Sequence, residues 1–448
     1  MKKTPHNMAK DIASLGLVVL GSMTLMPVIA QAEDPLELEF TYVAPKQQSQ
    51  VAFVPFAGDT AISPVVLNNL SQTELRATSQ NLPQQPHSSR ELTGTLPVWQ
   101  KTGIPYLAVG STQSNKGKVV TTFEVIDVKT GRSLGGEQTL TANNDRASLR
   151  YAGHVIADKI YELITGTPGD FSGRIAYIQE SGSIKDKTSQ LMVMDADGEN
   201  VMPISPPIKG AIFSPAWSPD GNRIAYTVHM PNSYPMIYIQ NVTTANSRPQ
   251  VLTAGLKGSN MSPSFSPDGG SILFSGSHEG TADIYRISTS GGAAQKIIGS
   301  PYADVTPNYS PDGKSFLYVS DPGGNNKPQI NRYDFATGKV TKVSKGGYAV
   351  RPQYNADGTQ IAFLSGSSAA IMNTSGAIVT NLGSTGIDEA PSFSPNGKRV
   401  VYSTKQGGKA VLTIKSLSGG DTLYKSVAGT VRSPVSYTHL TLPTILRV

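Results

Sequence analysis

The chain has 448 residues, enough for two or three domains. Its hydrophobic fraction of 38% is ordinary, its charged fraction of 16% is low, and its net charge of +6 is mild for this length. With no block of like charges, these values argue against a nucleic-acid binder, and the absence of cysteine excludes disulfides, thiolate chemistry and zinc–thiolate sites. Glycine and proline are spread along the chain, which indicates many turns between short strands.

The N-terminus predicts a secretory signal peptide over residues 1–32. Three lysines precede an apolar stretch at 12–29, and Ala30-Gln31-Ala32 supplies a small-residue cleavage site. The alternative is an uncleaved membrane anchor, which is disfavoured because small and polar residues dilute the stretch and no basic flank follows it. We therefore expect a mature protein that begins at Glu33, does not insert into the membrane, and lies in a Gram-negative periplasm.

Residues 33–166 show no repeat and predict an α/β domain. Strands are expected at 50–56, 106–109 and 119–128, and a first helix opens near Ser63-Pro64. A second helix has apolar residues every three or four positions from Leu149 to Leu163, with Asn144 or Asp145 to cap its start and Gly166 to end it. The segment 165–173, rich in glycine and proline, is expected to be a linker.

Residues 167–436 carry an internal repeat. Its template is proline, any residue, an aromatic, then Ser-Pro-Asp-Gly or a close variant, and it recurs every 39 to 48 residues from Pro215, Pro263, Pro307, Pro352 and Pro391. The aromatic is suited to packing between neighbouring sheets, and Pro, Asp and Gly suit the successive positions of a tight turn. Because a strand-like run follows each template, this period is typical of a β-propeller.

The two ends of the repeat region predict how a ring would close. Residues 174–177 form a strand without a template, and residues 433–436 form half a template without its strand. Joined, they complete a sixth unit, so we expect an α/β N-terminal domain followed by an all-β six-bladed β-propeller. Residues 437–448 depart from the repeat and have the appearance of a foreign tail, which leaves the closing sheet without the aromatic of the template.

Several segments of both domains are more specific for one protein family than the repeat is, because such repeats occur in many propellers. They are Leu149-Arg-Tyr-Ala-Gly-His154, Leu163-Ile-Thr-Gly166, Arg174-Ile-Ala-Tyr177 and Ser214-Pro-Ala-Trp-Ser-Pro-Asp-Gly221, with Val54-Pro-Phe56 and Leu82-Pro-Gln-Gln-Pro86. Together they resemble the TolB family of the periplasmic Tol–Pal system, from the signal peptide to about Ser436. The resemblance implies an α/β domain before a six-bladed propeller. It also implies a scaffold without enzymatic activity or cofactor, which supports outer-membrane integrity and constriction at cell division.

The resemblance also implies a site for the lipoprotein Pal at one mouth of the propeller. Colicins and filamentous phage exploit the same system. The positions to which the family's Pal site carries over lie just before the repeat prolines, and they are Asn260, Ser262, Asp304, Val305, Thr306, Asp388, Glu389 and Ala390. The alternative is that these residues only shape the turns.

A second partner, TolA, is implied at the extreme N-terminus of the mature chain. The positions concerned are Glu33, Asp34, Pro35, Leu36, Glu37, Leu38, Glu39 and Phe40. Apolar and polar residues alternate from Leu36 to Tyr42, so this segment could add to the edge of a partner's sheet. The alternative is an ordinary first strand of the α/β domain.

Enzymatic alternatives are weaker. A prolyl-peptidase-like serine hydrolase shares such repeats but needs a further catalytic domain, and a sugar-processing propeller spaces its repeat residues differently. Gly131-Arg-Ser-Leu-Gly135 matches a nucleophile elbow, yet a hairpin-like sequence follows it where a helix is needed. Asp195-Ala-Asp-Gly198 is interpreted as a hairpin turn, and the histidines show no metal-ligand spacing, so His154 is expected to form structural hydrogen bonds. We expect no enzyme, no metal and a monomer.

Overall fold

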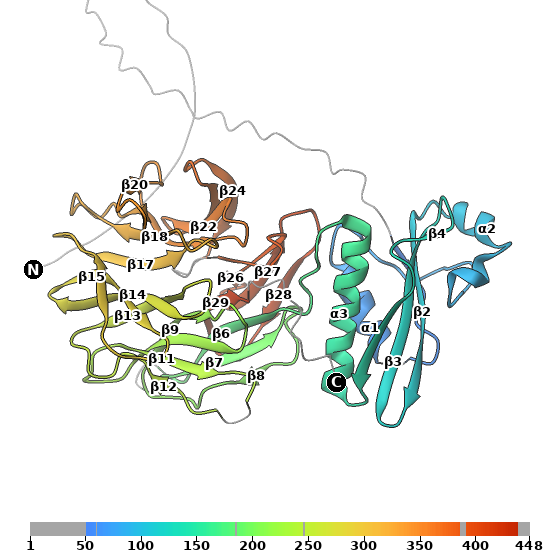
Figure 1. Ribbon diagram of the computed structural model, residues 1–448, viewed down its shortest axis with the longest axis horizontal. Coiled ribbons are helices and arrows are strands. Elements are labelled where there is room, and N and C mark those ends of the chain that lie inside the picture. Colours follow the sequence, from blue (N-terminus) through green and yellow to red (C-terminus); the bar gives the residue numbers. More distant parts are fainter. Residues whose placement is uncertain (1–50, 60, 184–185, 245–246, 386–390, 438–448) are drawn as a thin grey trace, which may run out of the picture. The chain divides into compact units, whose positions relative to one another are not determined.

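The computed structural model describes residues 51–437 apart from 60, 184–185, 245–246 and 386–390 (Figure 1). The expected signal peptide and the tail after Tyr437 lie outside the described residues. From Val51 to Thr165 the chain forms a mixed sheet with helices, which we call the N-terminal part. From Arg174 to Ser436 the described elements are strands, which we call the propeller part. None of the described helices is long and apolar enough to cross a membrane.

The N-terminal part is built around one five-stranded sheet with the order β1-β2-β3-β4, in which β5 also pairs with β3. β1 runs parallel to β2, and the other pairs are antiparallel. In chain order the elements are β1 (Val51–Phe53), α1 (Ile62–Ser71), the 3-10 helix η1 (Ser89–Leu92), α2 (Leu96–Gln100), β2 (Tyr106–Asn115), β3 (Lys118–Asp127), β4 (Arg132–Ser133), β5 (Gln138–Asn143) and α3 (Arg146–Thr165).

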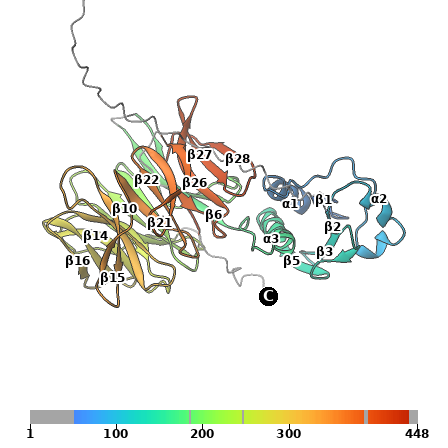
Figure 2. The same ribbon diagram turned by 90° about the horizontal axis from the view of Figure 1, so that it is seen from above.

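Both faces of this sheet are buried. α1 and α3 lie side by side (Figure 2) and share one hydrophobic core with the sheet, to which Val66, Ile156 and Phe53 belong. The fully buried Trp99 of α2 belongs to a second core on other sheet residues. Since each fully buried large side chain stabilises the fold by about 1.5–3 kcal/mol, the two cores hold the helices on the sheet.

The ends and the packing face of α3 agree with the sequence prediction. The Asp145 side chain accepts a hydrogen bond from the Ser148 N–H at 2.9 Å, and Gly166 ends the helix in the left-handed region at φ 73°. Gly153 lies against α1, where an added Cβ would come within 2.7 Å of the Val65 Cβ. The glycine of the Leu-Arg-Tyr-Ala-Gly-His segment therefore allows the two helices to approach closely.

The propeller part consists of four-stranded sheets, and six of them are formed by the described residues. Listed from the template strand outward, they are β29 (Thr430–Ser436), β6 (Arg174–Ser181), β7 (Thr188–Asp195), β8 (Met202–Pro203); β9 (Ala211–Trp217), β10 (Arg223–His229), β11 (Met236–Asn241), β12 (Gln250–Val251); β13 (Asn260–Phe265), β14 (Ser271–Glu279), β15 (Thr281–Ser288), β16 (Gln295–Ile298); β17 (Asp304–Tyr309), β18 (Ser315–Ser320), β19 (Gln329–Asp334), β20 (Val340–Lys342); β21 (Ala349–Tyr354), β22 (Gln360–Ser365), β23 (Ser368–Asn373), β24 (Ile378–Ser384); and β25 (Ser392–Phe393), β26 (Arg399–Gln406), β27 (Lys409–Ser416), β28 (Thr422–Ser426).

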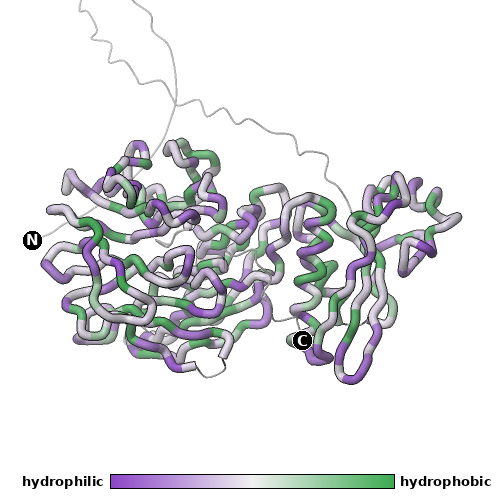
Figure 3. Tube along the Cα trace, viewed as in Figure 1, coloured by the Kyte–Doolittle hydropathy of each residue, from purple (hydrophilic) through white to green (hydrophobic). Residues whose placement is uncertain are grey.

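Hydrophobic residues concentrate in the strands and hydrophilic residues at many of the connections (Figure 3). The template turns are held by their own side chains. In the first of them the Ser218 hydroxyl donates to Asp220 Oδ1 at 2.5 Å and accepts from the Arg223 N–H at 2.9 Å, while Gly221 has φ 67°. The template aromatic that precedes the turn is buried in each complete repeat, as Trp217 illustrates at 8% exposure. The serine, the aspartate and the glycine of the template therefore serve the fold.

Neighbouring template strands are linked by hydrogen bonds from one sheet to the next. The N–H of Tyr309 donates to Ser264 Oγ at 3.1 Å, and the N–H of Tyr354 donates to Asn308 Oδ1 at 2.9 Å. The N–H of Ser436 donates to Ser392 Oγ at 3.1 Å. The residue after the template proline thus fixes the spacing between adjacent sheets.

One sheet combines strands from the two ends of the repeat region, as the sequence predicts. β29 pairs antiparallel with β6, with Val435 opposite Ala176 and Ser436 opposite Ile175. Tyr437, which the sequence analysis assigns to the tail, continues this pairing through a hydrogen bond from its N–H to the Arg174 carbonyl at 2.8 Å. Its ring lies 5.6 Å from the Trp217 ring, so an aromatic does reach the closing sheet, one residue later than the template places it.

Candidate functional site

The strand ends define two faces of the propeller part. In each sheet, the template turn joins the first strand to the second, and another turn on the same side joins the third strand to the fourth. We call this side the turn face. Because paired strands are antiparallel, the loops between second and third strands and the connections between sheets lie on the opposite side, which we call the loop face. The template strands begin at the loop face, so the predicted Pal-binding positions lie towards it.

The residues just before the repeat prolines form a recurrent β-bulge. Their φ angles lie between 45° and 56°, and the pairing of the template strand with the second strand shifts at these positions. They are Ser214, Ser262, Thr306, Arg351 and Ser433. The N–H of Ser262 donates to Thr227 Oγ1 at 3.2 Å, and that of Thr306 donates to Ser275 Oγ at 3.0 Å. The bulge therefore also links adjacent sheets.

Two predicted Pal-binding residues are buried. Asn260 is 0% exposed and its Oδ1 lies 2.6 Å from His278 Nε2. Asp304 is 1% exposed, and burial raises its pKa, although hydrogen bonds from Ser320 and Ser300 act in the opposite direction. Both side chains are therefore shielded from the surface.

The other predicted partner residues divide into two groups. Ser262, Val305 and Thr306 are half-buried and border the surface. Asp388, Glu389 and Ala390 lie outside the described residues, as do the expected TolA-binding residues Glu33 to Phe40. The structure thus brings Ser262 and Thr306 to equivalent places on neighbouring sheets.

A central cavity of about 470 Å³ lies between the template strands of the six sheets. Its lining includes the template prolines, hydroxyl groups and the rings of Tyr309 and Tyr354. Arg351 is the one charged side chain among the described lining residues, and neither His, Asp nor Glu occurs among them. These residues offer hydrogen bonds and contact area, and they supply no carboxylate or imidazole for general acid–base chemistry.

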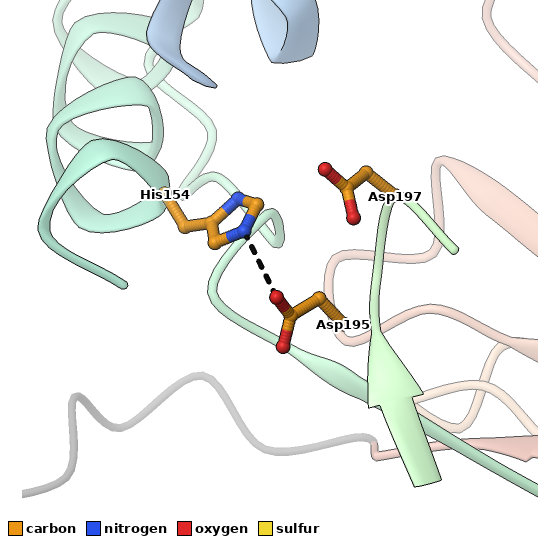
Figure 4. A group of neighbouring side chains, drawn as sticks. All are labelled: His154, Asp195 and Asp197. Carbon is orange, nitrogen blue, oxygen red and sulfur yellow. Dashed lines mark ion pairs between the residues drawn. The ribbon is translucent and has the colours of Figure 1, made fainter. Parts of the chain in front are cut away.

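The N-terminal part meets the turn face through polar side chains of α3. Arg150 Nε lies 2.8 Å from Asp195 Oδ2, and Arg150 Nη2 lies 2.5 Å from Asp197 Oδ2. His154, one helical turn further, points its Nε2 at Asp195 Oδ2 at 3.5 Å (Figure 4), and its Nδ1 lies 2.8 Å from Asn69 Nδ2. The arginine and the histidine of the Leu-Arg-Tyr-Ala-Gly-His segment therefore contact one propeller carboxylate, which agrees with a structural role for His154.

His154, Asp195 and Asp197 could in principle hold a metal ion, since one ligand atom from each lies within 4.8 Å of the others. The Arg150 guanidinium, however, already binds both carboxylates. Burial raises the pKa of Asp195, but hydrogen bonds from His154 and Arg150 outweigh this and leave the pKa below its ordinary value. An ion would have to displace the arginine, so the geometry favours a buried ionic link between helix and propeller.

The linker between the two parts forms a second contact, which the sequence pattern did not predict. The buried Asp158 of α3 accepts hydrogen bonds from the N–H groups of Phe171 at 2.6 Å and Ser172 at 3.1 Å. Arg399, at the start of β26, forms an ion pair with Asp170 and stacks its guanidinium 5.1 Å from the Phe171 ring centroid. A comparable arginine–aromatic contact joins Arg174 to Trp217 in the next sheet, so Phe171 takes the place of a template aromatic.

The two motifs that suggested other chemistry are turns or strand ends. Ser133, the central residue of the elbow-like motif, lies on β4 opposite Ile126, and the next described element is the strand β5. Asp195-Ala-Asp-Gly198 joins β7 to β8, with the Gly198 N–H bound to the Asp195 carbonyl at 2.9 Å. Ser133 thus lies on a strand rather than in the expected turn, although a strand and not a helix follows it, and Asp195 to Gly198 form the expected hairpin turn.

The fold defines a β-propeller protein with a small α/β part ahead of the propeller. A family model described as "TolB beta propeller domain" matches residues 161–437. The Tol-Pal system protein TolB of Acinetobacter baylyi is 38% identical over 433 residues, covering 95% of this chain and 98% of that protein. Its namesake from Bordetella pertussis is 35% identical and covers 75% of both chains. A crystal structure of TolB from Acinetobacter baumannii superposes with a TM-score of 0.74 at 35% identity, covering 88% of this chain and 98% of that one. The chain belongs to the TolB family.

Proposed function

We propose that this protein is a non-enzymatic scaffold of a periplasmic Tol–Pal system, which binds Pal at the propeller mouth and TolA through its mature N-terminus. It would thereby support outer-membrane integrity and constriction at cell division. The observation that carries the proposal is the 38% identity, over 95% of the chain, to a protein named for the Tol–Pal system. The proposal includes cleavage after Ala32, an α/β domain at 33–166, a closed six-bladed ring at 167–436 and a monomeric state.

The arrangement of the two faces supports a Pal site on the loop face. The contacts of α3 and the linker with the propeller involve Asp195, Asp197 and Arg399, which lie at the turn face. Partner binding at the opposite face would not compete with them. We propose that Ser262, Val305 and Thr306 border the Pal interface, with Asp388, Glu389 and Ala390, and that the buried Asn260 and Asp304 hold the rim in shape.

The proposed TolA site rests on the alternation of apolar and polar residues from Leu36 to Tyr42. A strand of this kind binds by pairing its backbone with an exposed sheet edge of the partner. Residues Glu33 to Phe40 would supply that strand, separately from the propeller.

The test is a calorimetric titration of residues 33–448 with soluble Pal, repeated after deletion of 33–42. We expect Pal to bind both forms, because its site lies on the propeller. In a parallel titration with the periplasmic domain of TolA, the deletion should abolish binding. Absence of Pal binding in both forms, with the fold intact by circular dichroism, would refute the proposal. Loss of Pal binding in the deleted form alone would refute the separation of the two sites.

A further inference from the structure

The loop face carries exposed tyrosines on successive loops. Tyr234 is 67% exposed on the loop between β10 and β11, Tyr302 is 40% exposed just before β17, and Tyr348 is 45% exposed just before β21. The fourth exposed tyrosine among the described residues, Tyr424, lies on the outer strand β28. Tyrosine is enriched at binding hot spots because it supplies a large contact area at a small cost in conformational entropy.

Lysines accompany these tyrosines. Lys257 and Lys327 are exposed on loops of the same face, Lys405 and Lys409 are exposed at the facing ends of β26 and β27, and none of the four forms an ion pair among the described residues. Several described acidic side chains of this face are paired with lysines, whereas Asp321 on the loop of Lys327 forms no ion pair among the described residues. Asp186 lies 3.7 Å from Lys209, and Glu279 lies 3.0 Å from Lys296. The described part of the loop face is therefore basic.

Backbone hydrogen bonds bring the lysine loops next to the tyrosine loops. The Asn260 N–H donates to the carbonyl of Pro235 at 2.8 Å, which joins the loop of Lys257 to that of Tyr234. The Ala349 N–H donates to the carbonyl of Pro328 at 3.0 Å, which joins the loop of Tyr348 to that of Lys327. Tyr302 lies on the connection between these two pairs of loops. Basic and aromatic groups thus alternate along one arc of the face.

We infer that the loop face binds an acidic protein surface, with Tyr302 and Tyr348 as aromatic anchors and Lys257 and Lys327 opposite carboxylates of the partner. The inference rests on the proposed function, to which it adds the chemistry of the interface. Unpaired lysines around a contact area speed association with an acidic partner and reject basic ones. The lysines come from separate loops and do not converge on one point, which fits dispersed carboxylates better than a single phosphate group.

Four double variants of the chain 33–448 test the inference by calorimetry with soluble Pal at low and high salt. K257E/K327E reverses two loop-face charges, and K314E/K339E makes the same change on two exposed turn-face lysines. Y302A/Y348A removes the anchors, and Y424A with Ile378→Ala removes exposed apolar groups from outer strands. We expect each loop-face variant to weaken Pal binding about tenfold or more, with a weaker salt dependence for K257E/K327E, and each control to stay within about twofold.

The outcomes separate the inference from the proposed function. If Pal binds the wild type and both loop-face variants equally well, the inference is overturned and the proposed function stands. If Pal does not bind the wild type, the proposed function fails. A titration with a polyglutamate peptide then tests whether the loop face binds an acidic ligand. Polyglutamate binding that is lost in K257E/K327E and kept in K314E/K339E supports an acidic ligand. If polyglutamate does not bind the wild type, the inference is overturned. Binding of phosphatidylglycerol vesicles that depends on Lys257 and Lys327, without an effect of these residues on Pal, would assign the face to lipid and also overturn the inference.

Discussion

Arg150 and His154 show how a short sequence segment can join two parts of a molecule. They stand one helical turn apart on α3 and reach the same carboxylate of Asp195. That carboxylate is only 15% exposed on its side chain, so its ionised form depends on these partners. Removal of one partner from a buried ionic link leaves the others uncompensated, which costs more than the loss of an exposed pair.

We expect Asp195→Asn to lower the free energy of unfolding by about 1–3 kcal/mol at neutral pH, as urea denaturation would measure. Because the pKa of Asp195 lies below its ordinary value of 3.8, its stabilising effect is present at neutral pH and is lost as the pH falls through the folded-state pKa. The difference between variant and wild type should therefore shrink on acidification. The matched control is Asp186→Asn, an exposed pair with Lys209, whose cost should stay below about 0.5 kcal/mol. Equal costs for the two variants would contradict the link.

The linker is the element in which structure adds most to the sequence. Its glycine and proline content predicted only a connection, whereas Phe171 and Asp170 pack on Arg399 of the last complete sheet. The contact could not be predicted because it depends on two segments 229 residues apart. The caps of α3, by contrast, were predictable from Asp145 and Gly166, since capping depends on neighbouring residues alone.

Asp158 gives the linker a dependence on pH. Burial raises its pKa to about 6, with a further contribution from Asp170, although hydrogen bonds from Ser172 and Phe171 oppose the shift. A carboxyl whose folded-state pKa is raised stabilises the fold below its ordinary pKa, and that stabilisation is lost as the pH rises through about 6.

From this group the wild type should lose up to about 3 kcal/mol of stability between about pH 4 and about pH 8. Asp158→Asn keeps the shape but cannot ionise. The stability of the wild type relative to Asp158→Asn should therefore fall with rising pH, in chemical denaturation at several pH values. A difference that does not change with pH would show that Asp158 titrates normally.

At the scale of the whole molecule, the repeat predicted the sheets because each template contains its own turn. The aromatic, the Ser-Pro-Asp-Gly turn and the following strand recur together, as at Trp217 to Tyr226. The partner-binding residues were less predictable. Asn260 and Asp304 precede the template prolines as expected and begin the template strands β13 and β17, yet both are buried. A position in the repeat specifies the place along a strand but not the exposure of the side chain.

The closing sheet has a serine at the position where the other sheets have the template aromatic. Ser436 occupies the register of the template aromatic, is 7% exposed and lines the central cavity. An aromatic at this position would add buried apolar area beside the central cavity, so we expect Ser436→Phe to raise the melting temperature by about 2–4 °C, the size of a stabilisation near 1 kcal/mol. Differential scanning calorimetry would measure it, with Ser436→Ala as the control for loss of the hydroxyl. An unchanged or lower value would mean that Phe171 and Tyr437 already take the place of the template aromatic.

The sheet that combines β29 with β6 also has a consequence for the kinetics of folding. Arg432 and Glu180, which meet across β29 and β6, are 252 residues apart in the chain. Contacts of such long range raise the contact order and carry a large loop-closure entropy, so we expect the pairing of β29 with β6 to form late in folding. Until then β6 has an unpaired edge, and an incomplete chain would expose it to pairing with other strands. We therefore expect the final residues of the repeat to protect the edge of β6 from aggregation once they pair with it.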